Sequence, residues 1–347
     1  MTTGADATAR GLGAVTLGLA ATALLVQAWR GGGPAAPRDR APRGSRRVRT
    51  GAHAVTHPSA CAQVRTLRLD SAPVRRQPGA LESSDGPARG LHAAAALLAA
   101  SVLADSAVEH ARGGFDNPGM ITPLLSALAA LAAGAGGAAH ARPLRAQGGV
   151  YGTALAVGAA GTAFHVYNLL ARPGGISWAN LFYGAPLGAP AALSLAGVLG
   201  LGALRTASGR GDAQADGRAL CGIVCGALLG TTAEVALLHF RGAYQNPFMW
   251  LPVTVPPVAA ALIGAHALAP ASTSRRRARA WLALTGLLGI GGMGFHAYGV
   301  SRQMGGWRNW RQNVLSGPPL SAPPGFTALA LGGLSSLALL DRRAPAP

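Results

Sequence analysis

HFRGAYQNPFMWLP, residues 239–252, has a close counterpart earlier in the chain, HARGGFDNPGMITP at residues 110–123. Both stretches contain His, Arg-Gly, an aromatic residue, Asn-Pro, Met and Pro in the same register. Two further matches follow in the same order: FHVY (164–167) with FHAY (295–298), and NLFYGAPLGAP (180–190) with NVLSGPPLSAP (313–323). The sequence therefore predicts an internal duplication, with one repeat at residues 89–210 and the other at 211–347.

The composition is that of a membrane protein. Half of the 347 residues are hydrophobic and only 12% are charged, with a mean hydropathy of +0.29. All 30 basic residues are Arg, and most of them lie in loops between apolar stretches. This distribution favours a role in membrane orientation over nucleic-acid binding. Cys61, Cys221 and Cys225 lack the spacing of a metal site or a disulfide framework.

Eight apolar stretches are long enough to be membrane spans, four in each repeat. We expect each to be a helix, because lipid offers no hydrogen-bond partners to the backbone. The expected spans are residues 91–111, 120–139, 149–170, 182–204, 219–240, 249–269, 280–300 and 325–340. Four spans return the chain to the side where it started, so the repeats should be parallel. The predicted fold is an all-α, polytopic membrane protein.

Two segments precede the repeats. Residues 1–29 contain an apolar run, 11–28, which we interpret as an N-terminal transmembrane helix; the alternative is a signal-like segment. Residues 30–88 are rich in Arg and Pro without sustained periodicity, which predicts a disordered linker. A further alternative is that translation starts shortly before Leu91.

The Arg residues predict the orientation. Loops on one side contain the run Arg275 to Arg277 with Arg279, and also Arg142, Arg145, Arg205, Arg210, Arg218, Arg342 and Arg343. The positive-inside rule makes that side cytoplasmic and the side with the repeated motif external. The composition is typical of a GC-rich bacterial gene, so we expect the bacterial inner membrane.

Four histidines are candidate ligands. His110 and His165 should lie at similar depth in the first repeat, as should His239 and His296 in the second. Two imidazoles from neighbouring helices suit haem b, and the nearby Met120 and Met249 add thioethers that would suit copper. The alternative is that each histidine only bonds to a carbonyl group or a loop.

Asp105 and Glu234 occupy equivalent positions five residues before His110 and His239. Ionisable groups within a membrane span are functional candidates, and we expect a proton relay. The alternative is a buried carboxyl group that stabilises the bundle.

Other repeated polar residues are candidates for binding an anion or another ligand. A repeated Arg112 and Arg241 could form bidentate pairs with a carboxylate or phosphate. Asn117 and Asn246, each before Pro, are also typical helix N-caps. The remaining members of this set are Asn180 with Asn313 and Tyr167 with Tyr298.

These residues favour a membrane redox subunit that binds haem or metal, and quinol, near its external face, with a separate redox partner subunit. In span count the chain resembles the quinol-binding membrane subunits of polysulfide-reductase-type complexes, with no motif shared. Two other functions remain open: a transporter or binding protein for a small polar solute with an external vestibule, and a structural membrane partner without a cofactor. The sequence leaves open whether the protein is an enzyme.

Overall fold

The computed structural model describes residues 78–140, 146–209, 211–269 and 274–342, and all regular structure in these ranges is helical. The expected N-terminal helix, residues 1–29, and residues 30–77 of the expected linker lie outside the described residues. The helices of the first half are α2 (Pro78–Arg112), η1 (Pro118–Ile121), α3 (Thr122–Ala139), α4 (Gln147–Leu170), α5 (Trp178–Tyr183) and α6 (Gly188–Ser208). Those of the second half are α7 (Ala213–Arg241), η2 (Pro247–Trp250), α8 (Leu251–Leu268), α9 (Arg275–Ser301), η3 (Gly306–Asn309), α10 (Trp310–Ser316) and α11 (Pro324–Leu340).

Six of the described helical segments are long and apolar enough to cross a bilayer: α2 from Gly86 onward, η1 with α3, α6, α7, η2 with α8, and α9. The protein is therefore a multi-pass membrane protein whose helices contact lipid. Two of the eight expected spans are not among these six. The apolar residues of α4 are interrupted along its length by Gly and by polar residues such as Tyr151, Thr162 and His165, and α11 has only 17 residues.

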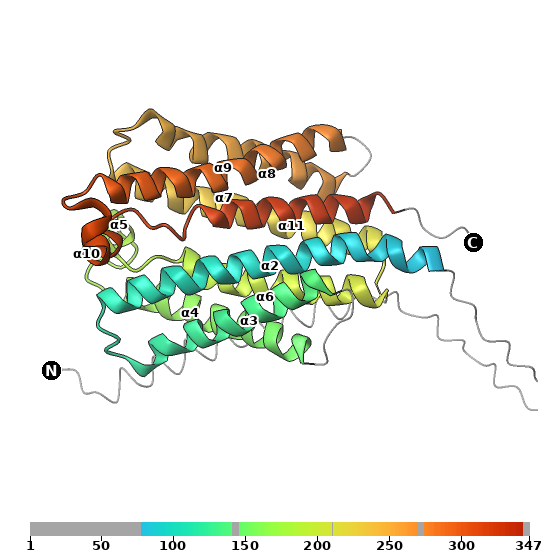
Figure 1. Ribbon diagram of the computed structural model, residues 1–347, viewed down its shortest axis with the longest axis horizontal. Helices are drawn as coiled ribbons and strands as arrows, with labels where there is room; N and C mark the ends of the chain where they lie inside the picture. Colours follow the sequence, from blue (N-terminus) through green and yellow to red (C-terminus); the bar gives the residue numbers. More distant parts are fainter. Residues whose placement is uncertain (1–77, 141–145, 210, 270–273, 343–347) are drawn as a thin grey trace, which may run out of the picture.

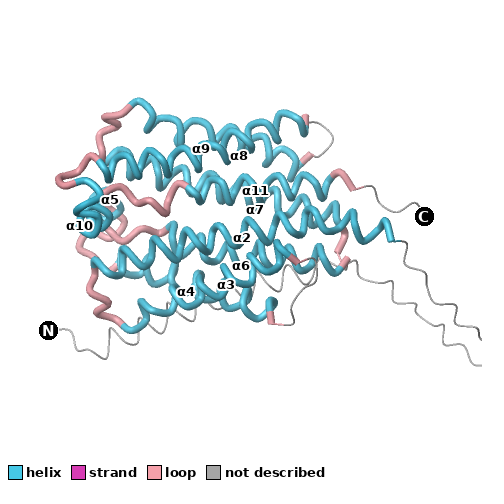
Figure 2. Tube along the Cα trace, viewed as in Figure 1, coloured by secondary structure: helices cyan, strands magenta, loops and turns pink. Residues whose placement is uncertain are grey.

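The long helices form a bundle with a central layer and two outer pairs (Figures 1 and 2). α2, α6, α7 and α11 lie in the centre, where α2 packs against α6 and α11, and α7 also packs against α11. α3 and α4 cover one side of this layer, whereas α8 and α9 cover the other. The contact between the two halves is thus made by the first and last long helices of each half.

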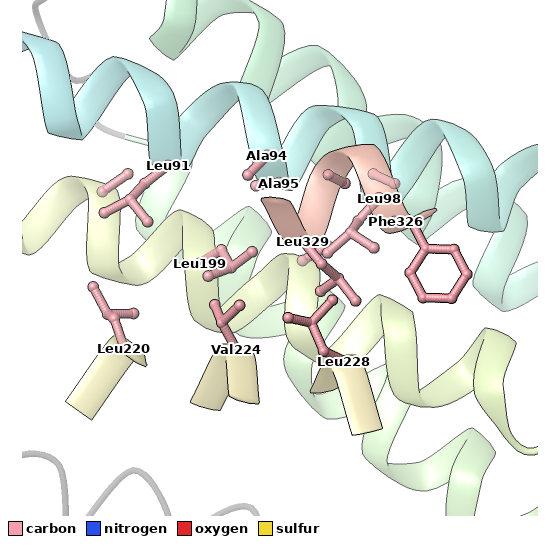
Figure 3. Packing of buried hydrophobic residues seen from close by; sticks show 14 of the residues in the cluster. Leu91, Ala94, Ala95, Leu98, Leu199, Leu220, Val224, Leu228, Phe326 and Leu329 are labelled. Atoms are coloured by element: carbon pink, nitrogen blue, oxygen red, sulfur yellow. The ribbon is translucent and has the colours of Figure 1, made fainter. Parts of the chain in front are cut away.

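The centre of the bundle is packed with Leu and small residues contributed by both halves. Figure 3 shows the cluster, which includes Leu91, Ala95 and Leu98 of α2, Leu199 of α6, Leu220, Val224 and Leu228 of α7, and Phe326 and Leu329 of α11. Close approach of helices depends on glycine. A Cβ on Gly158 of α4 would lie 2.3 Å from the backbone nitrogen of Ser194, and one on Gly289 of α9 would lie 2.3 Å from Oγ1 of Thr327. Small residues at such crossings let membrane helices pack backbone to backbone.

Two boundaries differ from the sequence-based expectation. α2 begins at Pro78, so residues 78–88 of the expected linker are helical, with Pro87 inside the helix. The fourth expected span began at residue 182, but residues 178–183 form the separate helix α5 and the long helix α6 starts only at Gly188. The chain is extended between them because Gly184 and Pro186 disfavour continuation of the helix.

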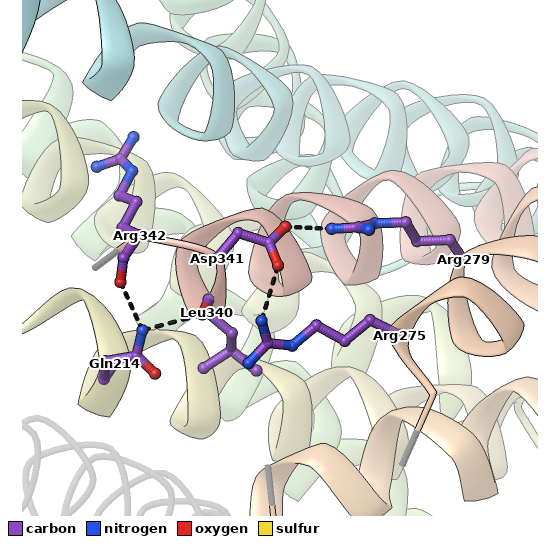
Figure 4. A network of polar contacts seen from close by, with 6 residues as sticks. All are labelled: Gln214, Arg275, Arg279, Leu340, Asp341 and Arg342. Atoms are coloured by element: carbon purple, nitrogen blue, oxygen red, sulfur yellow. Dashed lines mark hydrogen bonds and ion pairs between the residues drawn. The ribbon is translucent and has the colours of Figure 1, made fainter. Parts of the chain in front are cut away.

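The bundle has two chemically different ends. α5 and α10 lie at one end, and the start of α2 and the end of α11 lie at the other (Figure 1). At the second end, Asp341 pairs with Arg275 at 2.8 Å and also with Arg279, while Gln214 donates to the carbonyl groups of Leu340 and Arg342 (Figure 4). These contacts join the end of α11 to the starts of α7 and α9.

Candidate functional site

Both copies of the repeated motif form the same turn. The turn follows α2 in the first half and α7 in the second, and in both the aromatic residue takes a left-handed backbone conformation: φ is 54° at Phe115 and 48° at Tyr244. Its amide nitrogen donates to the carbonyl oxygen of His110 or His239, at 3.1 and 3.2 Å. This conformation is unfavourable for a bulky L-residue. It places the aromatic ring edge-on to the imidazole, with ring centroids 6.2 Å apart in the first copy and 6.1 Å in the second.

The motif histidines make one equivalent hydrogen bond each. Nδ1 of His110 lies 2.7 Å from the carbonyl oxygen of Met120, and Nδ1 of His239 lies 2.9 Å from that of Met249. A carbonyl oxygen only accepts, so Nδ1–H is the donor and the neutral ring keeps its lone pair on Nε2.

The second histidine pair follows the same rule. Nδ1–H of His165 on α4 donates to the carbonyl oxygen of Pro186 at 2.6 Å, and that of His296 on α9 donates to Pro319 at 2.5 Å. Both prolines lie in the extended segments that lead into α6 and α11. Each half therefore contains two histidines whose Nδ1–H donates to a backbone carbonyl group, one beside the motif turn and one beside the extended segment.

Asp105 and Glu234 contact the extended segment of the opposite half. Oδ1 of Asp105 accepts a hydrogen bond from the Ser321 hydroxyl at 3.1 Å, and Oε1 of Glu234 accepts one from the Gly188 amide at 2.9 Å. Ser321 and Gly188 occupy the same position in the two matched segments. Each carboxyl group thus bonds to the other half, so both lie where the halves meet.

The acids and their partners are matched in size. A Cβ on Gly188 would lie 1.6 Å from Oε2 of Glu234, so a side chain at this position would collide with the carboxylate. Glu234, the acid with the longer side chain, therefore bonds to the backbone amide of Gly188, a residue with no side chain to obstruct it. The shorter acid, Asp105, is instead met by the side chain of Ser321, whose carbonyl oxygen also accepts from Ser101 at 2.5 Å.

The two arginines reach across in the same way. Arg112 donates to the carbonyl oxygen of Leu315 in α10 and forms an ion pair with Glu109. Arg241 lies over the ring of Phe182 in α5, 5.6 Å from its centroid. Leu315 and Phe182 are equivalent positions in the matched segments, so each arginine contacts the short helix of the opposite half.

The asparagines organise the loops. The side chains of Asn117 and Asn246 accept from the amides of Gly119 and Phe248, at 2.8 and 3.0 Å, which confirms the N-caps that Asn-Pro predicts. Asn180 donates to the carbonyl groups of Pro173 and Gly175, and Asn313 donates to those of Met304 and Gly306. All four amide groups thus hold backbone in place at the same end of the bundle.

The remaining candidates lie around this end. The methyl groups of Met120 and Met249 pack against the glycine that follows each motif arginine, since a Cβ there would lie 3.4 and 3.0 Å away. Tyr298 is exposed and lies under the Arg302 guanidinium, 6.0 Å from the ring centroid, whereas Tyr167 is half-buried.

The donor set in each half is two imidazoles with free Nε2 atoms. Among the described residues, no group of three or more His, Cys, Asp or Glu side chains is arranged to hold a metal ion. Two imidazoles are the number of axial ligands that a bis-histidine haem takes, and imidazole also ligates copper.

Sequence reasoning missed the partners of these groups. The carbonyl groups of Pro186 and Pro319, the Gly188 amide and the Ser321 hydroxyl all lie in the matched GAPLGAP and GPPLSAP runs. Their repetition was the available signal, but it does not identify the side chains they meet.

The chain matches no protein-family model, no curated protein and no solved structure.

Proposed function

We propose that the protein is a redox subunit of the bacterial inner membrane that holds haem b or copper at His110 with His165 and at His239 with His296. In this proposal all eight long helices span the bilayer as two parallel four-helix repeats, with the motif end external and the Arg-rich end cytoplasmic. The ion pairs and basic helix ends at one end of the bundle support this orientation through the positive-inside rule.

One observation carries the proposal: all four histidines donate Nδ1–H to a backbone carbonyl group. A histidine that ligates a metal through Nε2 is usually fixed in this way, because the bond sets both the tautomer and the ring orientation. Repetition of the arrangement in both halves gives two equivalent sites.

The protein's own groups have defined roles in this proposal. A bound haem or copper ion would supply one-electron transfer. Asp105 and Glu234 would take up and release the protons that accompany oxidation of a quinol, since each bonds to an extended segment that also accepts a hydrogen bond from His296 or His165. Arg112 and Arg241 would offset the charge of bound anionic groups, and electrons would pass to a partner subunit.

An absorption spectrum of the detergent-purified protein, oxidised and then reduced with dithionite, tests the cofactor directly when combined with elemental analysis. We expect a b-type spectrum or stoichiometric copper, lost by half in His165→Ala or His296→Ala and fully in the double variant. His140→Ala is the matched control, because His140 is exposed at the end of α3 and should leave the signal unchanged. Full retention of the cofactor in the double variant would refute the proposal.

The relay has its own test. Asp105→Asn and Glu234→Gln preserve shape but remove the titratable group. We expect both variants to keep the cofactor and to flatten the pH dependence of its midpoint potential. An unchanged pH dependence in both variants would remove the acids from the mechanism.

A structural role without a cofactor is the second candidate. It is favoured by the observation that the motif arginines and asparagines all bind loops or short helices of the same chain. The bonds from the four histidines to backbone carbonyl groups are also those expected of histidines with a purely structural role. It predicts a folded, colourless and metal-free protein in which His165→Ala and His296→Ala lower the melting temperature and change nothing else.

A further inference from the structure

One groove in the membrane region is independent of the redox proposal. It lies between α3 and α4 and has a volume of about 860 Å³. On the α3 side the groove is lined by residues 118–129, which lie in the part of the helix near the motif end of the bundle. On the α4 side it is lined by residues 146–157, which lie near the Arg-rich end because α4 runs in the opposite direction to α3. The two walls together extend along the full length of the bundle.

The walls combine larger apolar side chains, such as Ile121 and Val150, with small residues on one face of each helix. Thr122, Ser126 and Ala129 follow one another at helical spacing on α3, as do Gly149 and Thr153 on α4. Stripes of small residues are typical of surfaces where one membrane helix packs closely against another.

Ser126 is a second and separate sign of a missing neighbour. It is only 7% exposed and lines the groove, yet within the described part of the chain its hydroxyl group has no hydrogen-bond partner. A buried hydroxyl without a partner is unfavourable. A polar group from an occupant of the groove would satisfy it.

The second half keeps only one of these five small residues. At the positions equivalent to Thr122, Ser126 and Ala129, α8 has larger side chains: Leu251, Val255 and Val258. On α9, the position equivalent to Thr153 has Leu284, whereas that equivalent to Gly149 has Ala280. A symmetric requirement of the fold therefore does not explain the small residues on the α3/α4 side.

We propose that the occupant is the N-terminal apolar segment of the same chain, residues 11–28, docked between α3 and α4 as an additional membrane helix. Its own small residues Ala14, Gly18 and Thr22 recur every four positions and would form one face against the groove. The apolar run is followed by Arg30 and an Arg-rich stretch, which is costly to place inside a bilayer. We therefore expect the segment to end on the side of the membrane where α2 starts, and to run parallel to α3.

The chain between residue 28 and Pro78 is long enough for the segment to dock on either outer face of the bundle, so linker length does not decide between them. The small residues that allow close helix packing lie on the α3/α4 face, which is therefore the expected docking site. In parallel register at about 1.5 Å per residue, Gly18 lies at the depth of Ala129 and Ala14 lies within about one residue of the depth of Ser126. Because Ala14 and Gly18 have little or no side chain, a backbone carbonyl group of the segment is the acceptor that we expect for the Ser126 hydroxyl.

Disulfide cross-linking tests the proposal in the full-length protein. The background carries Cys61→Ser, Cys221→Ala and Cys225→Ala, with a protease site inserted between residues 50 and 60. Gly18→Cys is combined with Ala129→Cys, and the matched control combines Gly18→Cys with Val258→Cys, the equivalent position on α8. After oxidation and cleavage, the first pair should keep the N-terminal fragment attached on a non-reducing gel, and the control should release it.

Four results would overturn the proposal: equal cross-linking in both pairs, no cross-link in a monodisperse protein, dimers between two copies before cleavage, or a purified protein whose mass lacks residues 1–28. A lipid or a second copy would then be the occupant.

Filling the groove gives an independent test. Gly149→Leu with Thr153→Leu changes two exposed positions, so the core is left intact, and should reduce the Gly18–Ala129 cross-link at least tenfold; an unchanged yield would contradict the docking.

Discussion

The contacts of the two half-buried acids, Asp105 and Glu234, differ between the halves in a way that can be tested residue by residue. Gly188→Ala would insert a methyl group 1.6 Å from Oε2 of Glu234 and displace the carboxylate from its amide. We expect a loss of about 2 kcal/mol or more, as for other overpacked sites. Ser321→Ala removes one hydrogen bond from Asp105 and should cost about 1 kcal/mol. Thermal unfolding in detergent measures both effects.

Shortening the acid provides the control for this prediction. In the double variant Gly188→Ala with Glu234→Asp, the shorter side chain leaves room for the methyl group, so much of the lost stability should return. If the double variant is no more stable than Gly188→Ala alone, the collision is not the cause.

The motif turn provides a second matched pair of residues. Ala243 has a φ of 52°, and its equivalent in the first copy is Gly114, with a φ of 68°. A left-handed conformation is unfavourable for L-residues by roughly 1–2 kcal/mol and costs glycine little. Ala243→Gly should therefore raise stability by about 1 kcal/mol and Gly114→Ala should lower it by a similar amount. Melting temperatures that shift in the same direction in both variants would contradict this account.

At the scale of the helices, each short helix is held by an arginine of the opposite half. Arg241→Ala removes the contact with the Phe182 ring, which is worth about 1 kcal/mol, so amide exchange in α5 should rise about fivefold. Arg112→Ala should do the same to α10, because it removes the bond to Leu315. Hydrogen exchange followed by mass spectrometry distinguishes the helices. Each variant is the control for the other, and increased exchange at both helices in either variant would argue against this specific pairing.

The helices also indicate what the sequence could reveal. The apolar runs located most long helices, and Asn117 and Asn246 marked helix starts correctly because an Asn-Pro cap is a local signal. α5 was merged with α6, since Leu181 and Phe182 extend the apolar run although Gly184 and Pro186 interrupt the helix. The crossing of Ser321 to Asp105 was not predictable, because hydropathy and spacing do not specify which half a Pro-rich segment contacts.

At the scale of the whole molecule, helices of each half pack against helices of the other half. The central layer combines α2 and α6 with α7 and α11, and α5 and α10 each pack against the first long helix of the opposite half. The halves also meet through the acids and arginines described above. A unit built in this way should depend on both halves for stability, even though only the turn from Gly209 to Asp212 joins α6 to α7.

Cutting that turn tests the dependence. With a protease site inserted after Gly209, we expect the cleaved halves to elute together in gel filtration, because the buried contacts between them remain. Weakening the central layer should separate them: Leu199→Ala with Leu329→Ala removes two fully buried side chains, each worth about 2–5 kcal/mol in a well-packed core. Leu125→Ala, at a position on α3 that is 64% exposed and away from the contact between the halves, is the control and should leave the cleaved complex intact. Separation of the unmodified halves after cleavage would mean that the covalent turn, rather than the packing between the halves, holds the molecule together.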